Sequence, residues 1–143
     1  MRTRVLAVVA ALCLLITIFV VWRQFRGGEP LAVESLGPAS PEAAELTRWA
    51  AAVRQAGRDG GAKVVAERFH AEVPPERREA LARQIALRLL AAESPTPRSL
   101  RASTRGAVQA VWKCTPAPGS PAELALLFVR GDGGRLELSG LMP

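Results

Sequence analysis

Few side chains in this sequence could serve as nucleophiles, acid–base catalysts or metal ligands. The 143 residues include one His, two Cys, two Asp, no Tyr and no Asn. His70 has no Cys pair near it, so the ligand set of a zinc site is missing, and no Gly-x-Ser-x-Gly turn presents a nucleophilic Ser. The sequence therefore predicts no catalytic residue, no metal site and no cofactor. A small anchored isomerase or hydrolase that uses His70 or a buried Glu is the alternative.

Four residues are candidates for a ligand or partner surface: Trp49, His70, Trp112 and Lys113. The two Trp fall on the apolar sides of their elements, so they either fill the core or line a cavity that holds an apolar molecule. His70 follows Phe69 at a predicted helix end, where a protonated imidazole is favoured. These alternatives stay open at the level of sequence.

The two Cys differ in their surroundings. Cys114 shares its predicted face with Trp112, which predicts a buried and inert thiol, with a disulfide between two copies as the alternative. Cys13 lies in the N-terminal apolar run. The two therefore cannot pair within one domain.

The positive charge is not concentrated in the way that nucleic-acid binding requires. The formal net charge is +6, and four Arg flank the N-terminal apolar run. Residues 27–143 hold 15 Lys and Arg against 13 Asp and Glu, a net charge of +2. A nucleic-acid-binding protein needs a dense basic face to displace counterions. No nucleic-acid partner is expected.

Residues 5–22 form an uncharged run of 18 residues. As a helix this run rises about 27 Å, close to the thickness of a hydrocarbon core. No small-x-small cleavage site follows, which favours an uncleaved single-pass anchor, residues 1–26, over a cleaved signal peptide. Two Arg precede the apolar run and two follow it, so their number does not decide the orientation. The positive charge of the terminal amine favours a cytoplasmic N-terminus. The C-terminal part would then lie outside the cytoplasm.

The chain after the anchor divides into a tether and a domain. Residues 27–40 are rich in Gly, Pro and Ser and predict a flexible tether. Apolar residues at helical spacing predict helices from Pro41 to Gly57, over 61–71, and over 74–93. Ser40 is the expected N-cap of the first helix.

The period then changes to that of strands. Residues 107–115 alternate, 124–129 are apolar on both faces as in a central strand, and a third strand follows Gly134. A two-residue turn at Asp132-Gly133 would pair Val129 with Leu136 and Leu127 with Leu138. Residues 107–115 would then form a free sheet edge, open to strand addition.

The predicted fold class is α+β, with three helices packed on a three-stranded antiparallel meander over residues 41–143. Its predicted core is drawn from every element. The core residues are Trp49, Phe69, Leu81, Ile85, Leu89, Trp112, Leu127 and Leu138.

The closing segment Phe128–Leu141, after the three helices, resembles the end of nuclear-transport-factor-2-like (cystatin-like) domains. The resemblance implies a membrane-anchored member of the kind found in bacterial envelopes, in assembly factors of secretion and transport machines. No catalytic residue of that family can be placed by motif. The expected function is a non-catalytic binding or assembly module of the bacterial inner membrane, with membrane lipid around residues 5–22 and a neighbouring envelope protein as partners. A carrier of an apolar ligand is the further alternative.

Overall fold

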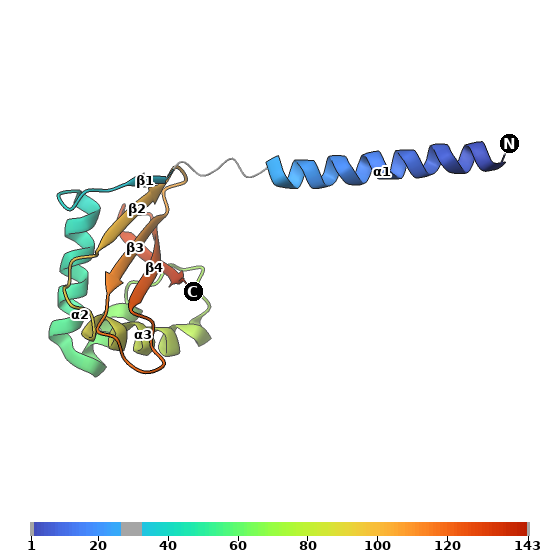
Figure 1. The fold of residues 1–143 in the computed structure, drawn as a ribbon. Helices are drawn as coiled ribbons and strands as arrows, with labels where there is room; N and C mark the ends of the chain where they lie inside the picture. Colours follow the sequence, from blue (N-terminus) through green and yellow to red (C-terminus); the bar gives the residue numbers. More distant parts are fainter. Residues whose placement is uncertain (1, 27–32, 143) are drawn as a thin grey trace. The chain divides into compact units, whose positions relative to one another are not determined.

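A computed structural model describes residues 2–26 and 33–142 (Figure 1). The chain divides into two units at residue 31, and each is described by itself. The first unit contains helix α1 (Arg2–Arg26). Its segment Thr3–Val21 has a mean hydropathy of 2.8, and no part of it is buried. Within the described residues this is the one helix long and apolar enough to cross a membrane, a property that signal sequences share.

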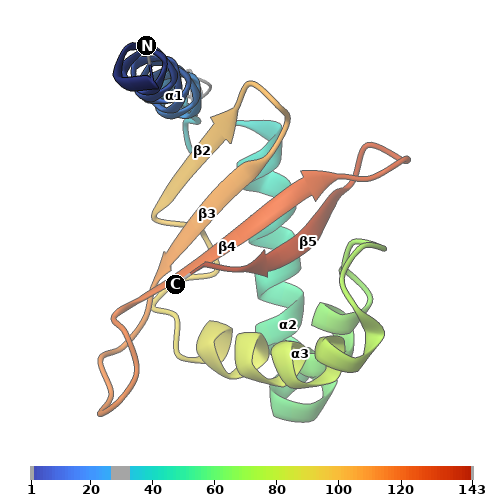
Figure 2. The same ribbon diagram turned by 90° about the vertical axis from the view of Figure 1, so that its right-hand side faces the viewer.

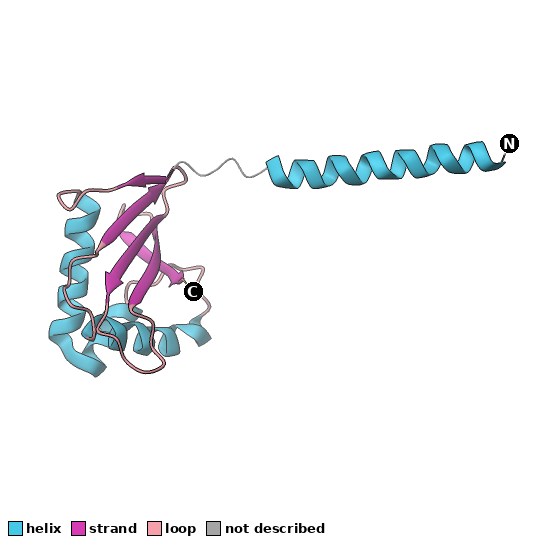
Figure 3. Cartoon of the chain, in the orientation of Figure 1, coloured by secondary structure: helices cyan, strands magenta, loops and turns pink. Residues whose placement is uncertain are grey.

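The second unit is a two-layer α+β domain. Its sheet is antiparallel throughout, in the order β1-β2-β3-β4-β5. Helix α2 lies against one face of the sheet, and α3 crosses the end of the sheet where β3 and β4 are joined (Figures 2 and 3). The strands are β1 (Val33–Ser35), β2 (Ser99–Ser103), β3 (Val108–Lys113), β4 (Glu123–Arg130) and β5 (Leu136–Leu141), and the helices are α2 (Pro41–Ala66) and α3 (Pro75–Leu90).

The predicted α+β class is confirmed, but the predicted count of elements is wrong. The domain has two helices instead of three and five strands instead of three. β1 falls inside residues 27–40, the expected tether, and pairs with β2. Between α1 and β1 stand residues 27–32, which lie outside the described residues. β2 occupies a segment for which no element was expected.

Helix α2 bends sharply at Gly57, where φ is 80° and ψ is −165°. This region of backbone space is essentially restricted to Gly. Beyond the bend the chain turns back, and this brings Gly61 against the carbonyl of Val53. The predicted break at Gly57 is confirmed, because α2 consists of two helical segments joined at this non-helical residue. The second segment ends at Ala66 and not at residue 71, so His70 lies after its end.

The hairpin between β4 and β5 has a longer turn than predicted. The amide of Gly134 donates to the carbonyl of Gly131, the amide of Gly131 donates to the carbonyl of Arg135, and the positive φ falls at Gly134. This is a three-residue loop closed by a residue in the left-handed region. The register shifts by one as a result, so that Phe128 pairs with Leu138 and Val129 with Glu137. The predicted Leu127–Leu138 and Val129–Leu136 pairs are therefore both wrong.

The core lies between the helices and the sheet. Trp49 of α2 packs edge-to-face on Trp112 of β3 and on Phe128 of β4, with ring centroids 6.2 and 5.4 Å away. Six of the eight predicted core residues are buried. The exceptions are Leu81, which is half-buried against the core, and Leu127, which the shifted register places on the opposite face of the sheet.

Candidate functional site

The face of the sheet that carries no helix presents a row of apolar side chains. In β4 the residues facing the helices are buried, whereas Ala125, Leu127 and Val129 alternate with them and are half-buried. Val111 of β3 pairs with Ala125 and extends the row. A sheet that faces water on one side normally has polar residues there. We call this row of four residues the open-face patch.

Polar side chains surround the open-face patch. Gln109 pairs with Leu127, and Glu137 pairs with Val129. Arg101 of β2 pairs with Gln109 and is exposed. An apolar centre inside a polar rim is the usual anatomy of a protein–protein interface.

The expected free edge at residues 107–115 is wrong. β3 is the middle strand of the sheet and has β2 on one side and β4 on the other. Sequence reasoning missed this because it missed β2, which pairs with β3 through Ser99–Ala102. Strand addition to β3 is therefore blocked by the chain itself.

The two true edges are β1 and β5, and β5 is largely closed. The amide of Leu138 donates to the carbonyl of Arg68, and the amide of His70 donates to the carbonyl of Leu138, at 2.7 and 2.9 Å. The amide of Leu136 donates to a carboxylate oxygen of Glu45 at 3.2 Å. β1 has three residues, and short strands blunt an edge.

Charged residues gather where α2 meets the β5 edge. Arg68 and Glu45 form an ion pair at 3.8 Å, with side chains 13% and 23% exposed. Burial lowers the pKa of the Arg68 guanidinium, and the nearby charge of Arg135 adds to this effect, whereas Glu45 and Glu137 oppose it. This ion pair lies beside the hydrogen bonds that join Glu45, Arg68 and His70 to β5.

The four residues suggested by the sequence do not form one surface. Trp112 is fully buried, and its Nε1 donates to the carbonyl of Pro95 at 2.9 Å. Trp49 is 6% exposed, so both Trp are core residues. Their rings fill the space that a ligand cavity would need.

His70 and Lys113 lie apart from the Trp pair. The Nδ1 atom of His70 accepts a hydrogen bond from the amide of Glu72 at 3.3 Å, within the turn that follows α2. Lys113 is exposed, and its Nζ lies 3.5 Å from a carboxylate oxygen of Glu93. His70 and Lys113 therefore each interact with a nearby residue, Glu72 and Glu93 respectively, and not with each other.

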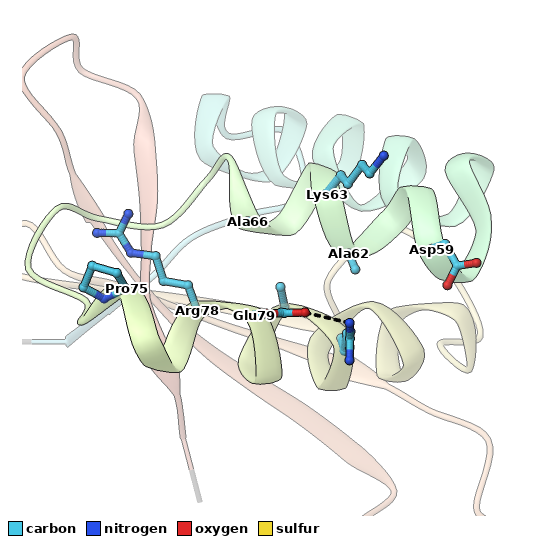
Figure 4. A pocket seen from close by; sticks show the side chains of 9 residues that line it. Asp59, Ala62, Lys63, Ala66, Pro75, Arg78 and Glu79 are labelled. Carbon is cyan, nitrogen blue, oxygen red and sulfur yellow. Dashed lines mark hydrogen bonds and ion pairs between the residues drawn. The ribbon is translucent and has the colours of Figure 1, made fainter.

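A groove of about 450 Å³ separates the end of α2 from α3 (Figure 4). Three of its five charged groups are engaged nearby: Arg78 donates to the carbonyl of Val73 at 2.9 Å, and Arg83 pairs with Glu79 at 2.6 Å. Asp59 and Lys63 complete its charged lining. Over residues 2–26 and 33–142, no three His, Cys, Asp or Glu side chains are grouped to hold a metal ion. The groove therefore brings no reactive groups together.

Comparison with known proteins gives no match. No family model, no curated protein and no solved structure is similar to this chain. The open-face patch and the apolar helix α1 are the two features of the described residues that point to a function.

Proposed function

We propose that this protein is a membrane-anchored binding module of the bacterial cell envelope, whose domain binds a neighbouring protein through the open-face patch. One observation carries the proposal: β4 is apolar on both faces, although helices cover only one of them. Strands that are apolar on both faces are typical of sheets covered on both sides. A protein partner would supply the second cover.

The anchor supports this function. Helix α1 has the length and hydropathy of a single membrane span. We place it in the inner membrane with its N-terminus in the cytoplasm, so that the domain lies outside. Anchoring confines the domain and its partner to one surface, which raises their effective concentration.

The packing of the domain counts against the ligand-carrier alternative. Trp49, Trp112 and Phe128 contact one another between the helices and the sheet. An apolar ligand bound there would have to displace buried aromatic side chains. A flat protein surface on the other side of the sheet needs no such rearrangement.

Site-specific photocrosslinking in intact cells of the native host tests the proposal. A photoreactive residue is placed at Leu127 in the open-face patch and, as a matched control, at the exposed Leu87 of α3. We expect one discrete higher-mass adduct from position 127 and none from position 87. Equal labelling from both positions, or no adduct from position 127, would contradict the proposed binding surface.

A second variant separates binding from folding. Leu127→Asp places a charge in the open-face patch without touching the buried face, so the fold should persist while the adduct from a photoreactive residue at the adjacent Val129 is lost. The near-ultraviolet circular dichroism of the buried Trp pair reports the fold. Persistence of the adduct in this variant would exclude the open-face patch as the contact.

The anchor has its own test. N-terminal sequencing of the membrane fraction should return the uncleaved chain, and protease added to spheroplasts should digest the domain. A mature chain that begins beyond α1 would refute the anchor, and protection from protease would refute the orientation.

A further inference from the structure

Two hairpin turns and the entry of the chain lie at the same end of the sheet. β1 runs antiparallel to β2, so Val33 pairs with Ser103, next to the turn between β2 and β3. Val108 pairs with Phe128, which brings the end of β4 to this end as well. The turn between β4 and β5 follows directly, at residues 131–135 (Figure 2). We call this the entry end of the sheet.

The entry end carries Arg side chains that have no carboxylate partner in the described part of the chain. Arg105 is exposed at the tip of the β2–β3 turn, and Arg101 is exposed on β2. Arg135, at the base of the second turn, donates to the backbone carbonyl of Glu67 at 3.3 Å. Asp132 is the carboxylate within these two turns, and Glu34 of β1 is exposed at the same end. Three Arg against these two carboxylates leave a small positive balance.

The opposite end of the sheet is different in kind. There β3 and β4 are joined by residues 115–121, which contain three Pro and no charged residue. Arg98 and Lys113, which lie near that end, are each paired with a Glu, at 2.8 and 3.5 Å. Of the two ends of the sheet, the entry end is therefore the one with Arg side chains that have no carboxylate partner among the described residues.

The covalent chain limits how far the entry end can be from a membrane that holds α1. Six residues, 27–32, separate α1 from β1. A fully extended chain spans at most about 3.6 Å per residue, so these residues cover roughly 20 Å at most. The opposite end of the sheet lies a strand length further along the domain. Of the two ends, the entry end has the shorter reach to the headgroups.

We propose that the entry end binds anionic lipid headgroups through Arg105, Arg101 and Arg135. This inference rests on the proposed anchoring of α1. An Arg near an anionic surface strengthens binding by about fivefold. Contact at this end would stand the strands up from the membrane, so that the open-face patch faces sideways, towards a neighbouring membrane protein.

Fluorescence quenching by headgroup-labelled lipid tests this directly on the full chain in nanodiscs. A fluorophore is attached to Gly133→Cys in the β4–β5 turn, where an added Cβ has open space, or to Ser120→Cys in the opposite loop. Both are made in a Cys13→Ala background, and the native Cys114 is buried. In discs of phosphatidylglycerol and phosphatidylcholine, spin-labelled headgroups should quench the label at position 133 more strongly than the label at position 120.

Charge variants then isolate the Arg contribution. Arg105→Gln should weaken docking by about fivefold. About 1 M NaCl should weaken docking more than this, because the Debye length falls to about 3 Å and all three Arg are screened. The matched control is Arg58→Gln, an exposed Arg of α2 without a partner in the described residues. It should leave the quenching unchanged.

Each outcome decides between the proposals. Equal quenching at positions 133 and 120, stronger quenching at 120, or no effect of Arg105→Gln overturns the headgroup contact. Alkaline carbonate extraction of the same sample reports the anchor separately. If carbonate strips the protein from the discs, the proposed anchoring fails too, whereas retention with equal quenching refutes the headgroup contact alone.

Discussion

Three glycines in the bend of α2 give predictions of different magnitude within five residues. Gly57 adopts a φ of 80°, so a side chain there is strained. A Cβ added at Gly61 would lie 2.8 Å from the carbonyl oxygen of Val53 and 3.2 Å from its Cγ1. At Gly60 the closest atom would be the Cβ of Ala56 at 3.2 Å. Each Gly is replaced singly by Ala.

The expected magnitudes follow from these contacts. In an ordinary helix, Gly→Ala stabilises by about 1 kcal/mol. At Gly57 the backbone strain should outweigh this gain, with a cost of about 1–3 kcal/mol. At Gly61 overpacking against a backbone atom costs about 1–3 kcal/mol, so that a net loss of up to about 2 kcal/mol is left after the helical gain. At Gly60 the tight contact and the helical gain nearly cancel, so the change should stay within about 0.5 kcal/mol.

Equilibrium unfolding in guanidinium, with the full chain in detergent micelles, measures these differences. Near-ultraviolet circular dichroism is the readout, because Trp49 of α2 and Trp112 of β3 pack against each other only in the folded domain. The order of stability should be Gly60→Ala above both of the other variants. A stabilised Gly61→Ala protein would mean that α2 runs straight through this region, and a stabilised Gly57→Ala protein would refute the left-handed backbone at the bend.

Three further substitutions or measurements test the packing. Trp112→Ala removes a fully buried side chain and its hydrogen bond to Pro95, and should cost about 3–5 kcal/mol; unchanged unfolding would remove this residue from the core. Glu45→Gln keeps an acceptor for the amide of Leu136 and should cost about 1 kcal/mol or less, whereas Glu45→Ala leaves that amide unpaired and should cost about 1–3 kcal/mol more; equal effects would contradict the hydrogen bond. Cys114 is 1% exposed and should react with a thiol reagent only as the domain unfolds, so rapid reaction of the native protein would place it at the surface.

The two layers of this fold could be predicted from the sequence, but two of the five strands of its sheet, β1 and β2, could not. The helices and the three C-terminal strands carry enough apolar residues to reveal their period. β2 contributes one buried residue, Leu100, and β1 has three residues in all. A strand this short, or with a single buried position, leaves no alternation to detect. The sequence therefore does not reveal both neighbours of β3, and it predicts an edge strand where the structure has a central one.

The register error has a different origin. Gly131–Gly134 contains three Gly, so the sequence permits either a two-residue turn or a three-residue loop with Gly134 in the left-handed region. A shift of one residue exchanges the faces of a strand. One signal could have decided the question: the correct register buries Phe128, the largest side chain of β4, whereas the predicted one buried Leu127 in its place. The same shift creates the open-face patch, which is why sequence reasoning did not identify it.

The closure of the β5 edge by residues 68–70 has a consequence for how the domain folds while the chain is being synthesised. Until residues 136–141 emerge from the ribosome, β4 is an unpaired edge with apolar residues on both faces, the kind of segment that promotes aggregation. Once it is synthesised, β5 pairs with β4 and covers this edge. The backbones of Arg68 and His70, which are synthesised much earlier, then form hydrogen bonds with Leu138 on the outer edge of β5. A chain interrupted by a stop codon in the β4–β5 turn would therefore lose more than one strand: it would leave its most adhesive edge uncovered, and we expect such a product to aggregate or be degraded.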